Sequence, residues 1–321
     1  MTGLVQGVFE LFPLSSLGHT VLVPSWIGGS WATLVRQESL AESPYLAFVV
    51  GLHLANAVAL VLFFSREWAR LIYGFFASAF RRRIDNDTER LAWLIVVATV
   101  PVGILGLVFE HEFRVLFAKP LAAALFLMGN GGILFAGELY RRRHQRAALP
   151  ADATGTGPAS GPPTPGPATS TALRGTTRFR DEHIMTIDDT AQHELAGIGF
   201  VSALCIGASQ ALALLAGISR EGVAMVGGLF RGLSNENAMR FAFLLSTPVI
   251  FAAGALKVPD LLGHLGNGIR GQVLAGSAAA VVMSLVALAF LTRYFKTRTL
   301  TPFAVYSVLF GLASVVRFGL F

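Results

Sequence analysis

Long apolar runs dominate this chain, and a run needs about 20 residues to cross a lipid bilayer as a helix. Six runs are close to that length, and we predict a membrane-spanning helix in each, near residues 44–64, 91–109, 120–139, 235–256, 271–292 and 300–318. The composition agrees, because 54% of the residues are hydrophobic and only 14% are charged, whereas soluble domains carry about 25% charged residues. The sequence therefore predicts an all-α, polytopic membrane protein.

Two further apolar regions are too interrupted to cross as single helices. Residues 2–30 are broken at Phe12-Pro13, and residues 195–233 are broken at Ala216-Gly217. Non-helical backbone at membrane depth is tolerated only where protein or a water-filled cavity covers it. We therefore predict that each region forms a re-entrant hairpin, in which two short helices are joined by a polar turn.

The order of these elements repeats along the chain. A first membrane unit, residues 1–140, has the hairpin at 2–30 and then three spans, and a second unit, residues 194–321, has the hairpin at 195–233 and three more. Three crossings reverse the direction of the chain, so we predict an inverted repeat, as in many transporter folds. Residues 141–193 are predicted to be a flexible cytoplasmic linker, because their Pro, Gly, Ser and Thr content does not support a packed core.

Clusters of basic residues flank the predicted spans. With six spans, three clusters fall on one membrane face, and the excess of positive charge predicts that this face is cytoplasmic. Both termini then lie outside the cytoplasm, and the first hairpin enters the membrane from outside. The clusters also account for the net charge of +6, so no nucleic-acid partner is expected. They are Arg66, Arg70 and Arg81 to Arg83; Arg141 to Arg143 and Arg146; and Arg293, Lys296 and Arg298.

The segment between the first two spans has its own pattern. Apolar positions alternate with basic ones over residues 66–86. Such a pattern is typical of an amphipathic helix that lies in the membrane interface.

The turn of the first hairpin concentrates polar side chains in apolar surroundings. Gln6 and Glu10 are four residues apart and share a helix face. Beside a phosphate, a carboxylate could hold a divalent cation, Mg²⁺ or Ca²⁺, or act as a general base. Ser15 and Ser16 suit helix N-caps or phosphate ligands at a helix N-terminus. His19 follows Ser16 by one helical turn, which permits a Ser–His pair, although a histidine in an apolar run is often only a packing residue.

The second hairpin carries its polar residues in the run Gly217-Ile218-Ser219-Arg220-Glu221-Gly222. Ionisable residues at membrane depth are costly and indicate function by default. Arg220 keeps its charge, and its guanidinium fork matches phosphate oxygens, although snorkelling to the interface is an alternative. Ser219 could add a hydroxyl donor, whereas Glu221 would repel a phosphate unless it is protonated, paired with an arginine or bound to a cation. The two turns together indicate chemistry on an anion, most simply a phosphate.

Both turns resemble the motifs of the undecaprenyl-diphosphate phosphatase family, the bacitracin-resistance type of integral membrane enzyme. That family shows a glutamate or glutamine, a three-residue gap, a glutamate, Phe-Leu-Pro, a serine run, glycine and histidine. Its second motif reads Pro-Gly-x-Ser-Arg-Ser-Gly, and two departures from it stand out here, Ala216 for the proline and Glu221 for the second serine. The matching residues are Gln6, Glu10, Phe12-Pro13, Ser15-Ser16, Gly18-His19, Gly217 and Ser219-Arg220, and His53-Leu54 in the first span is also similar to the family.

The resemblance implies hydrolysis of undecaprenyl diphosphate to undecaprenyl phosphate and inorganic phosphate in the bacterial plasma membrane. This reaction recycles the cell-wall lipid carrier and gives bacitracin resistance. A polyprenyl-phosphate flippase on the same fold is the rival prediction, because paired broken segments also mark transporter sites. The expected partners are a polyprenyl diphosphate lipid and the bilayer, and homodimerisation is left open.

The resemblance also implies residue roles, which the active site is expected to divide between the two turns. The attacking group is left open between Ser16, His19 and water. The implied catalytic residues are Glu10, Ser16, His19 and Arg220; the implied substrate-binding residues are Gln6, Ser15, Gly18, Gly217, Ser219, Glu221 and Gly222; and Glu10 and Gln6 are the candidate ligands of the divalent cation.

Overall fold

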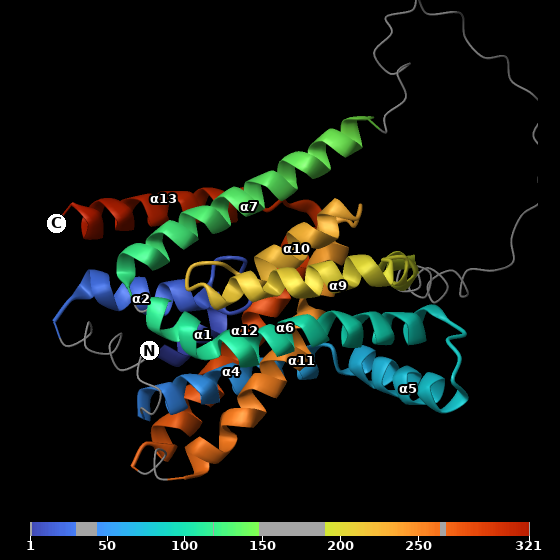
Figure 1. Ribbon diagram of the computed structural model, residues 1–321, viewed down its shortest axis with the longest axis horizontal. Helices are drawn as coiled ribbons and strands as arrows, with labels where there is room; N and C mark the ends of the chain where they lie inside the picture. Colours follow the sequence, from blue (N-terminus) through green and yellow to red (C-terminus); the bar gives the residue numbers. More distant parts are fainter. Residues whose placement is uncertain (1, 30–43, 118, 148–189, 264–267, 321) are drawn as a thin grey trace, which may run out of the picture.

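The protein is a bundle of packed helices, shown in Figure 1 as a computed structural model. The structure describes residues 2–29, 44–117, 119–147, 190–263 and 268–320, and no strand occurs in these ranges. The helices in chain order are α1 (Thr2–Phe9), α2 (Ser16–Ile27), α4 (Pro44–Phe63), α5 (Ser65–Arg81), α6 (Asp87–Phe117), α7 (Pro120–Ala147), α9 (Phe200–Ser209), the 3₁₀ helix η2 (Gln210–Leu214), α10 (Arg220–Phe230), α11 (Asn235–Leu262), α12 (Arg270–Thr297) and α13 (Thr301–Gly319). The all-α class predicted from the sequence is confirmed.

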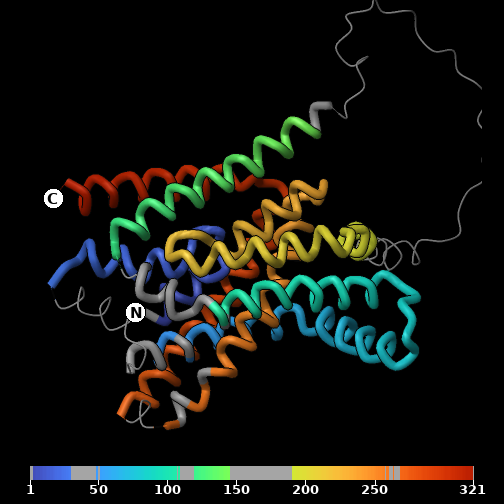
Figure 2. Tube along the Cα trace, viewed as in Figure 1, coloured from blue at the N-terminus to red at the C-terminus, as the bar shows by residue number. Residues whose placement is uncertain are grey.

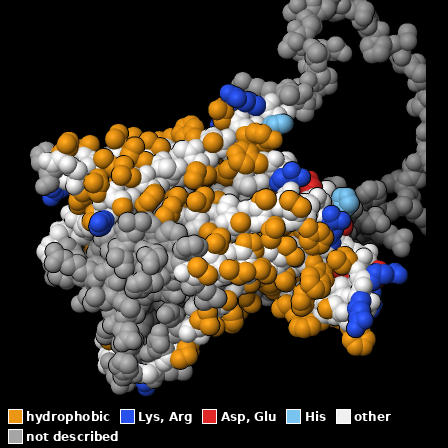
Figure 3. All heavy atoms as spheres, in the orientation of Figure 1, with side chains coloured by type: hydrophobic (Ala, Val, Ile, Leu, Met, Phe, Trp, Pro, Cys, Tyr) orange, Lys and Arg blue, Asp and Glu red, His pale blue; other side chains and the backbone are white. Residues whose placement is uncertain are grey.

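Helices occupy all six of the predicted spans. Five of them, α6, α7, α11, α12 and α13, are long and apolar enough to cross a membrane. The sixth, α4, covers the first predicted span with 20 residues, of which Gly51–Phe63 form a shorter apolar stretch. Large apolar side chains on these helices point outward, for example Leu125, Leu274 and Leu309, and they cover much of the surface in Figure 3. A chain with this surface requires a lipid environment, because soluble proteins rarely expose large contiguous apolar patches.

Both predicted breaks are present. In the first, α1 ends at Phe9 and α2 begins at Ser16. In the second, the 3₁₀ helix η2 ends at Leu214 and α10 starts at Arg220. A further bend of 82°, outside the predicted break, separates the short helix Thr190–Ala196 from the segment Phe200–Leu214. The helical path is thus interrupted at the polar turns, as the proline and glycine residues there predict.

The helix contacts are partly exchanged between the two predicted units. α1 packs on α12, whereas α9 packs on α6. In both contacts a glycine meets backbone: a Cβ on Gly3 would lie 2.4 Å from Gly276 O, and a Cβ on Gly207 would lie 1.9 Å from Ala98 O. Gly3, Gln6, Ser15 and Gly18 align without a gap with Gly207, Gln210, Ser219 and Gly222. The related chain segments therefore make related contacts.

The crossing of α7 with α13 has the same exchange within one contact. A Cβ on Gly131 would lie 2.8 Å from Ala304 O, and a Cβ on Gly311 would lie 3.0 Å from Ala124 O. Each helix thus supplies the glycine that admits the other helix's backbone. This reciprocity is what an internal two-fold relation predicts, and the inversion of the units across a membrane stays a prediction.

Most of the Lys and Arg side chains visible in Figure 3 gather at one end of the bundle, on the right. Hydrogen bonds tie the segments there together: His193 Nδ1 lies 2.8 Å from Asp87, Asn237 donates to Glu194, and Arg142 donates to Thr301. α13 ends at the opposite end (Figure 1). This arrangement agrees with the prediction that the clusters share one membrane face. α5 coincides with the predicted interfacial helix, and its Phe80 and Tyr73 side chains are 93% and 78% exposed.

Helices occupy both ends of the predicted linker, residues 141–193. α7 continues to Ala147, because Arg141 and Arg142 pair with Glu138 at helical spacing. The helix Thr190–Ala196 begins before the predicted second unit. The remainder, residues 148–189, lies outside the described residues.

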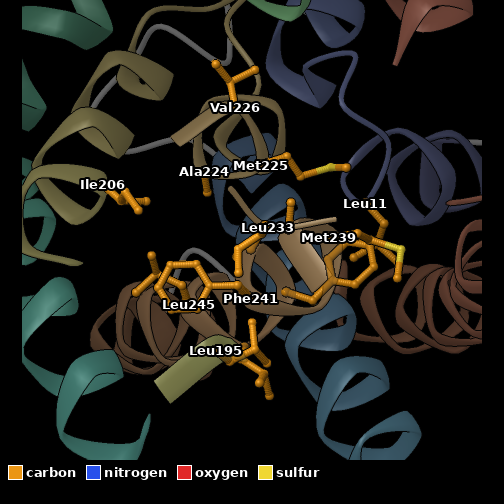
Figure 4. Packing of buried hydrophobic residues seen from close by; sticks show 14 of the residues in the cluster. Leu11, Leu195, Ile206, Ala224, Met225, Val226, Leu233, Met239, Phe241 and Leu245 are labelled. Carbon is orange, nitrogen blue, oxygen red and sulfur yellow. The ribbon is translucent and has the colours of Figure 1, made fainter. Parts of the chain in front are cut away.

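The main core joins the first broken segment to the second unit. Leu11 at the turn after α1 belongs to the same buried cluster as Met225 of α10 and Met239 of α11. Figure 4 shows these three side chains close together, beside Phe241 and Leu233. This packing holds the first polar turn against α10 and α11.

Candidate active site between the two broken helices

Two serines begin the helices that follow the two breaks. The Ser15 hydroxyl accepts a hydrogen bond from the Gly18 N–H at 3.2 Å, and the Ser219 hydroxyl accepts one from the Gly222 N–H at 3.1 Å. Each serine is therefore the N-cap of its helix, α2 or α10. A capped helix N-terminus offers a positive dipole end, which favours an anion nearby.

The two turns contact each other directly, as the neighbouring segments in Figure 2 suggest. Ser15 Oγ also accepts from the Gly217 N–H at 3.1 Å, and Ser219 Oγ donates to Phe12 O at 3.3 Å. Gly217 has φ of +121°, and a Cβ there would lie 2.5 Å from Ala123 O, so only glycine fits. The cap of each helix thus reaches the turn of the other segment.

Glu10 is the hub of the polar cluster. Its Oε2 atom accepts a short hydrogen bond from Ser16 Oγ and a bond of 2.9 Å from Gln6 Nε2. His53 of α4 approaches Oε2 to 3.4 Å, and Arg220 Nη1 lies 3.9 Å from Oε1. Glu10 is only 5% exposed. The carboxylate therefore faces a hydroxyl, an imidazole and a guanidinium within one buried pocket.

His19 lies elsewhere than the Ser–His hypothesis requires. Its Nδ1 atom lies 2.7 Å from Ser15 O and its Nε2 atom 2.9 Å from the Tyr306 hydroxyl of α13. The ring is 1% exposed and stacks on Phe9 with centroids 4.1 Å apart. Because both ring nitrogens have these partners, the hydrogen bond of Ser16 goes to Glu10 instead. The structure thus places His19 as a buried bridge between the first turn and α13.

Arg220 and Glu221 open α10 and face the same small cavity as Glu10 and Ser16. Within the described part of the chain, Arg220 Nη1, Glu221 Oε1 and Gln6 Oε1 are buried without a hydrogen-bond partner. Buried polar atoms nearly always have partners. The donor on Arg220 suits an anionic ligand, and the acceptors on Glu221 and Gln6 suit a cation or a hydrogen-bond donor. The site therefore fits an anion that is accompanied by a cation.

The cavity itself is narrow. Its volume is about 20 Å³, which holds roughly one water molecule. The Arg220 side chain is 21% exposed and forms part of its lining. A diphosphate group therefore enters only if side chains such as Arg220 move outward.

The donor set fits a hard divalent cation in part. Mg²⁺ is commonly held by one or two carboxylates together with substrate phosphate oxygens. Glu10 and Glu221 supply carboxylates in the cavity, and Gln6, which donates to Glu10 through Nε2, has an Oε1 atom without a hydrogen-bond partner. Among the described residues no three His, Cys, Asp or Glu side chains converge on a point. A cation here would thus depend on oxygens from the substrate.

Two contributors to the site were not among the predicted site residues. His53 contacts Glu10 and lies 3.1 Å from Gln6 Nε2, and an ionisable residue inside an apolar span was the signal that could have identified it. Asn130 of α7 is fully buried and hydrogen-bonds the backbone of both turns. Nothing in the spacing of the sequence brings residue 130 to this place.

These features define a class: an all-helical membrane protein whose two broken helices build a buried polar site that contains an arginine. The family description for bacitracin resistance protein BacA matches residues 1–313 of the chain. Known relatives include undecaprenyl-diphosphatase 2 of Frankia alni, 52% identical across 99% of this chain and 96% of the relative, and the undecaprenyl-diphosphatase of Mycolicibacterium paratuberculosis, 50% identical across 100% and 96%. A more distant one, undecaprenyl-diphosphatase 2 of Chromobacterium violaceum, is 36% identical across 97% and 95%. The chain belongs to the BacA family.

Proposed function

We propose that this protein is a membrane phosphatase that hydrolyses undecaprenyl diphosphate to undecaprenyl phosphate and inorganic phosphate. The observation that carries the proposal is the Ser16–Glu10–Arg220 arrangement, in which a hydroxyl is hydrogen-bonded to a carboxylate beside a guanidinium whose Nη1 atom has no hydrogen-bond partner. The names of the relatives favour hydrolysis over the flippase alternative. The reaction recycles the cell-wall lipid carrier, and through it the protein confers bacitracin resistance.

The chemistry divides between the two turns. Arg220 binds the oxygens of the terminal phosphoryl group, because its fork suits phosphate and its Nη1 donor is free. Ser16 attacks phosphorus while Glu10 accepts the hydroxyl proton, which activates the nucleophile. The bond to the bridging oxygen breaks, and undecaprenyl phosphate leaves with the proton that Glu10 had accepted, so Glu10 is a carboxylate again. Water then hydrolyses the phosphoserine, with Glu10 as the base for that water, and Ser16 and inorganic phosphate are released.

Other side chains prepare these groups. His53 lies beside Glu10 and holds the carboxylate in place against Ser16. Gln6 donates to the same carboxylate oxygen. Gly18 and Gly217 let the turns approach, since a Cβ on Gly18 would lie 2.9 Å from Gly217 Cα. Ser15, Ser219 and Gly222 fix the N-termini that face the substrate.

A divalent cation, Mg²⁺ or Ca²⁺, would be held by Glu10 and Gln6, with Glu221 from the second turn. When bound, it would neutralise charge on the diphosphate oxygens. This accounts for a carboxylate at position 221, where a negative charge alone would repel the substrate.

We further propose that the site opens toward the outside of the plasma membrane, with both termini on that side. Most of the Lys and Arg side chains visible in Figure 3 lie at the end of the bundle opposite to the end of α13. Positive charge favours the cytoplasmic face. Cysteine-accessibility labelling at position 317 and at position 83 in intact cells tests this orientation. Labelling of position 83 but not 317 by an impermeant reagent would contradict it.

Phosphate release from undecaprenyl diphosphate by the purified protein tests the function. We expect release that requires a divalent cation and falls to background in Ser16→Ala and Arg220→Ala variants. A wild-type protein that releases no more phosphate than these variants would refute hydrolysis. Lipid movement across vesicles in that case would favour the flippase.

A further inference from the structure

Asn130 holds the two polar turns with one side chain. Its Nδ2 group donates to Pro13 O at 2.9 Å, and its Oδ1 atom accepts from the Ser219 N–H at 3.0 Å. Nδ2 also lies 3.3 Å from Ser307 Oγ of α13. Asn130 is 0% exposed. Both ends of its amide are thus used, and each end binds the backbone of a different broken segment.

The two bonded positions stand next to the reacting groups. Pro13 precedes Ser16 by three residues, and Ser219 directly precedes Arg220. The Ser219 N–H is a free donor at a helix start, and Pro13 O lies in the non-helical turn, so neither has a partner within a helix. The amide of Asn130 satisfies both. A change of its position would move the Ser16 and Arg220 backbones relative to each other.

The backbone that carries Asn130 is itself fixed. Gly131, the next residue, lies at the crossing of α7 with α13, where a Cβ would approach Val308 N to 3.0 Å. Close backbone contact through glycine is the usual way in which membrane helices lock together. The amide is therefore held by a closely packed helix pair and can fix the positions of the two non-helical turns.

We propose that Asn130 is a positioning residue that sets the distance between the Ser16–Glu10 pair and the Arg220 guanidinium. The inference rests on the proposed phosphatase function. Asn130 touches neither substrate nor the reacting atoms, and it acts through the two turns. Misplacement of reacting groups by about 1 Å can cost roughly 100-fold in rate, so a residue of this kind affects turnover without taking part in it.

Two variants and one control test the proposal. Asn130→Ala removes both bonds, whereas Asn130→Asp keeps volume and the acceptor for the Ser219 N–H but places an oxygen against Pro13 O. We expect kcat/KM for undecaprenyl diphosphate to fall about 10- to 100-fold in both. The control, Ser307→Ala, removes a buried hydroxyl from the same cluster and leaves both turn contacts, so its kcat/KM should stay within about 2-fold of wild type. If Asn130→Ala does not fold, Asn130→Asp carries the test.

A double-mutant cycle separates positioning from a general effect on stability. If Asn130 acts by placing Arg220, the loss caused by Asn130→Asp should largely disappear in an Arg220→Lys background. Equal losses in both backgrounds, or wild-type kcat/KM in the single variants, would overturn the proposal while wild-type activity upholds the phosphatase. Absence of phosphate release from the wild type would overturn both.

Discussion

The two polar turns have the same cap arrangement but carry different side chains. Each begins a helix with a serine cap and has glycine three residues later, Ser15 with Gly18 and Ser219 with Gly222. The first turn then contributes the hydroxyl of Ser16 and the carboxylate of Glu10, whereas the second contributes the guanidinium of Arg220 and the carboxylate of Glu221. The shared frame gives two facing helix N-termini, and the differences turn that symmetric frame into a directional site. In the proposed mechanism, the first turn provides the attacking group and the second turn provides the positive charge that binds the phosphate.

The largest loss of activity should come from changing the carboxylate that the first turn contributes. Glu10→Gln keeps the size and the hydrogen bond with Ser16 but removes the base, so we expect kcat to fall about 10²- to 10⁴-fold. Little change in thermal stability is expected. The measurement is phosphate release at saturating substrate together with the melting temperature.

His19→Ala gives the contrast within the same turn. His19 is buried between Phe9, Tyr306 and the first turn, so this variant should lower the melting temperature as well as activity. A full loss of kcat with an unchanged melting temperature would instead restore His19 as the base for Ser16.

At the second turn, activity should depend on the planar geometry of the Arg220 side chain as well as on its charge. Arg220→Lys keeps the charge but loses the planar fork. A charge-assisted hydrogen bond contributes about 1.5–3 kcal/mol, so we expect kcat/KM to fall roughly 10- to 150-fold. Arg142→Lys is the matched control, because Arg142 is half exposed at the basic end of the bundle. Equal effects of the two substitutions would contradict a phosphate contact at Arg220.

Glu221 is where the second turn departs most from the family motif. If its carboxylate helps to hold a divalent cation, Glu221→Gln should raise the half-saturating Mg²⁺ concentration about 10-fold, equivalent to roughly 1.4 kcal/mol. Activity at saturating Mg²⁺ should change little. Glu236→Gln, at a glutamate 46% exposed on α11, should leave the Mg²⁺ dependence unchanged. Higher activity of Glu221→Gln at low Mg²⁺ would show that the carboxylate only repels substrate.

The sequence predicted the spans and the helix breaks better than it predicted the side-chain contacts between them. Apolar run lengths located the six spans, and Pro13 and Gly217 located the breaks, because these are local properties of the chain. The pairing of Ser16 with Glu10 was not predicted, since proximity in the sequence favoured His19. The turn between α1 and α2 redirects the chain, so residue 10 faces residue 16 while residue 19 points to α13.

Contacts between distant segments were the hardest features to predict from the sequence. Asn130 and His53 come from other helices, and their roles depend on how those helices pack. The matching register of Gly3, Gln6, Ser15 and Gly18 with Gly207, Gln210, Ser219 and Gly222 is visible in the sequence. Its meaning becomes clear only when Gly3 and Gly207 make the same kind of contact on α12 and α6.

The smallest expected effect concerns the caps themselves. The Ser15 hydroxyl accepts two N–H groups, from Gly18 and Gly217, whereas the Ser219 hydroxyl accepts the Gly222 N–H and donates to Phe12 O. Loss of a cap costs about 1 kcal/mol, and a buried N–H without a partner is tolerated less often than a buried carbonyl without one. Ser15→Ala leaves two N–H groups without this partner and Ser219→Ala only one, so Ser15→Ala should lower the melting temperature more. Ser15 also has a φ of +66°, a conformation that alanine disfavours and glycine adopts readily. Ser15→Gly should therefore be more stable than Ser15→Ala although both lack the hydroxyl. Equal melting temperatures for these two variants would mean that the first turn relaxes when its cap is removed, and that the two hydrogen bonds of the Ser15 hydroxyl hold the strained backbone.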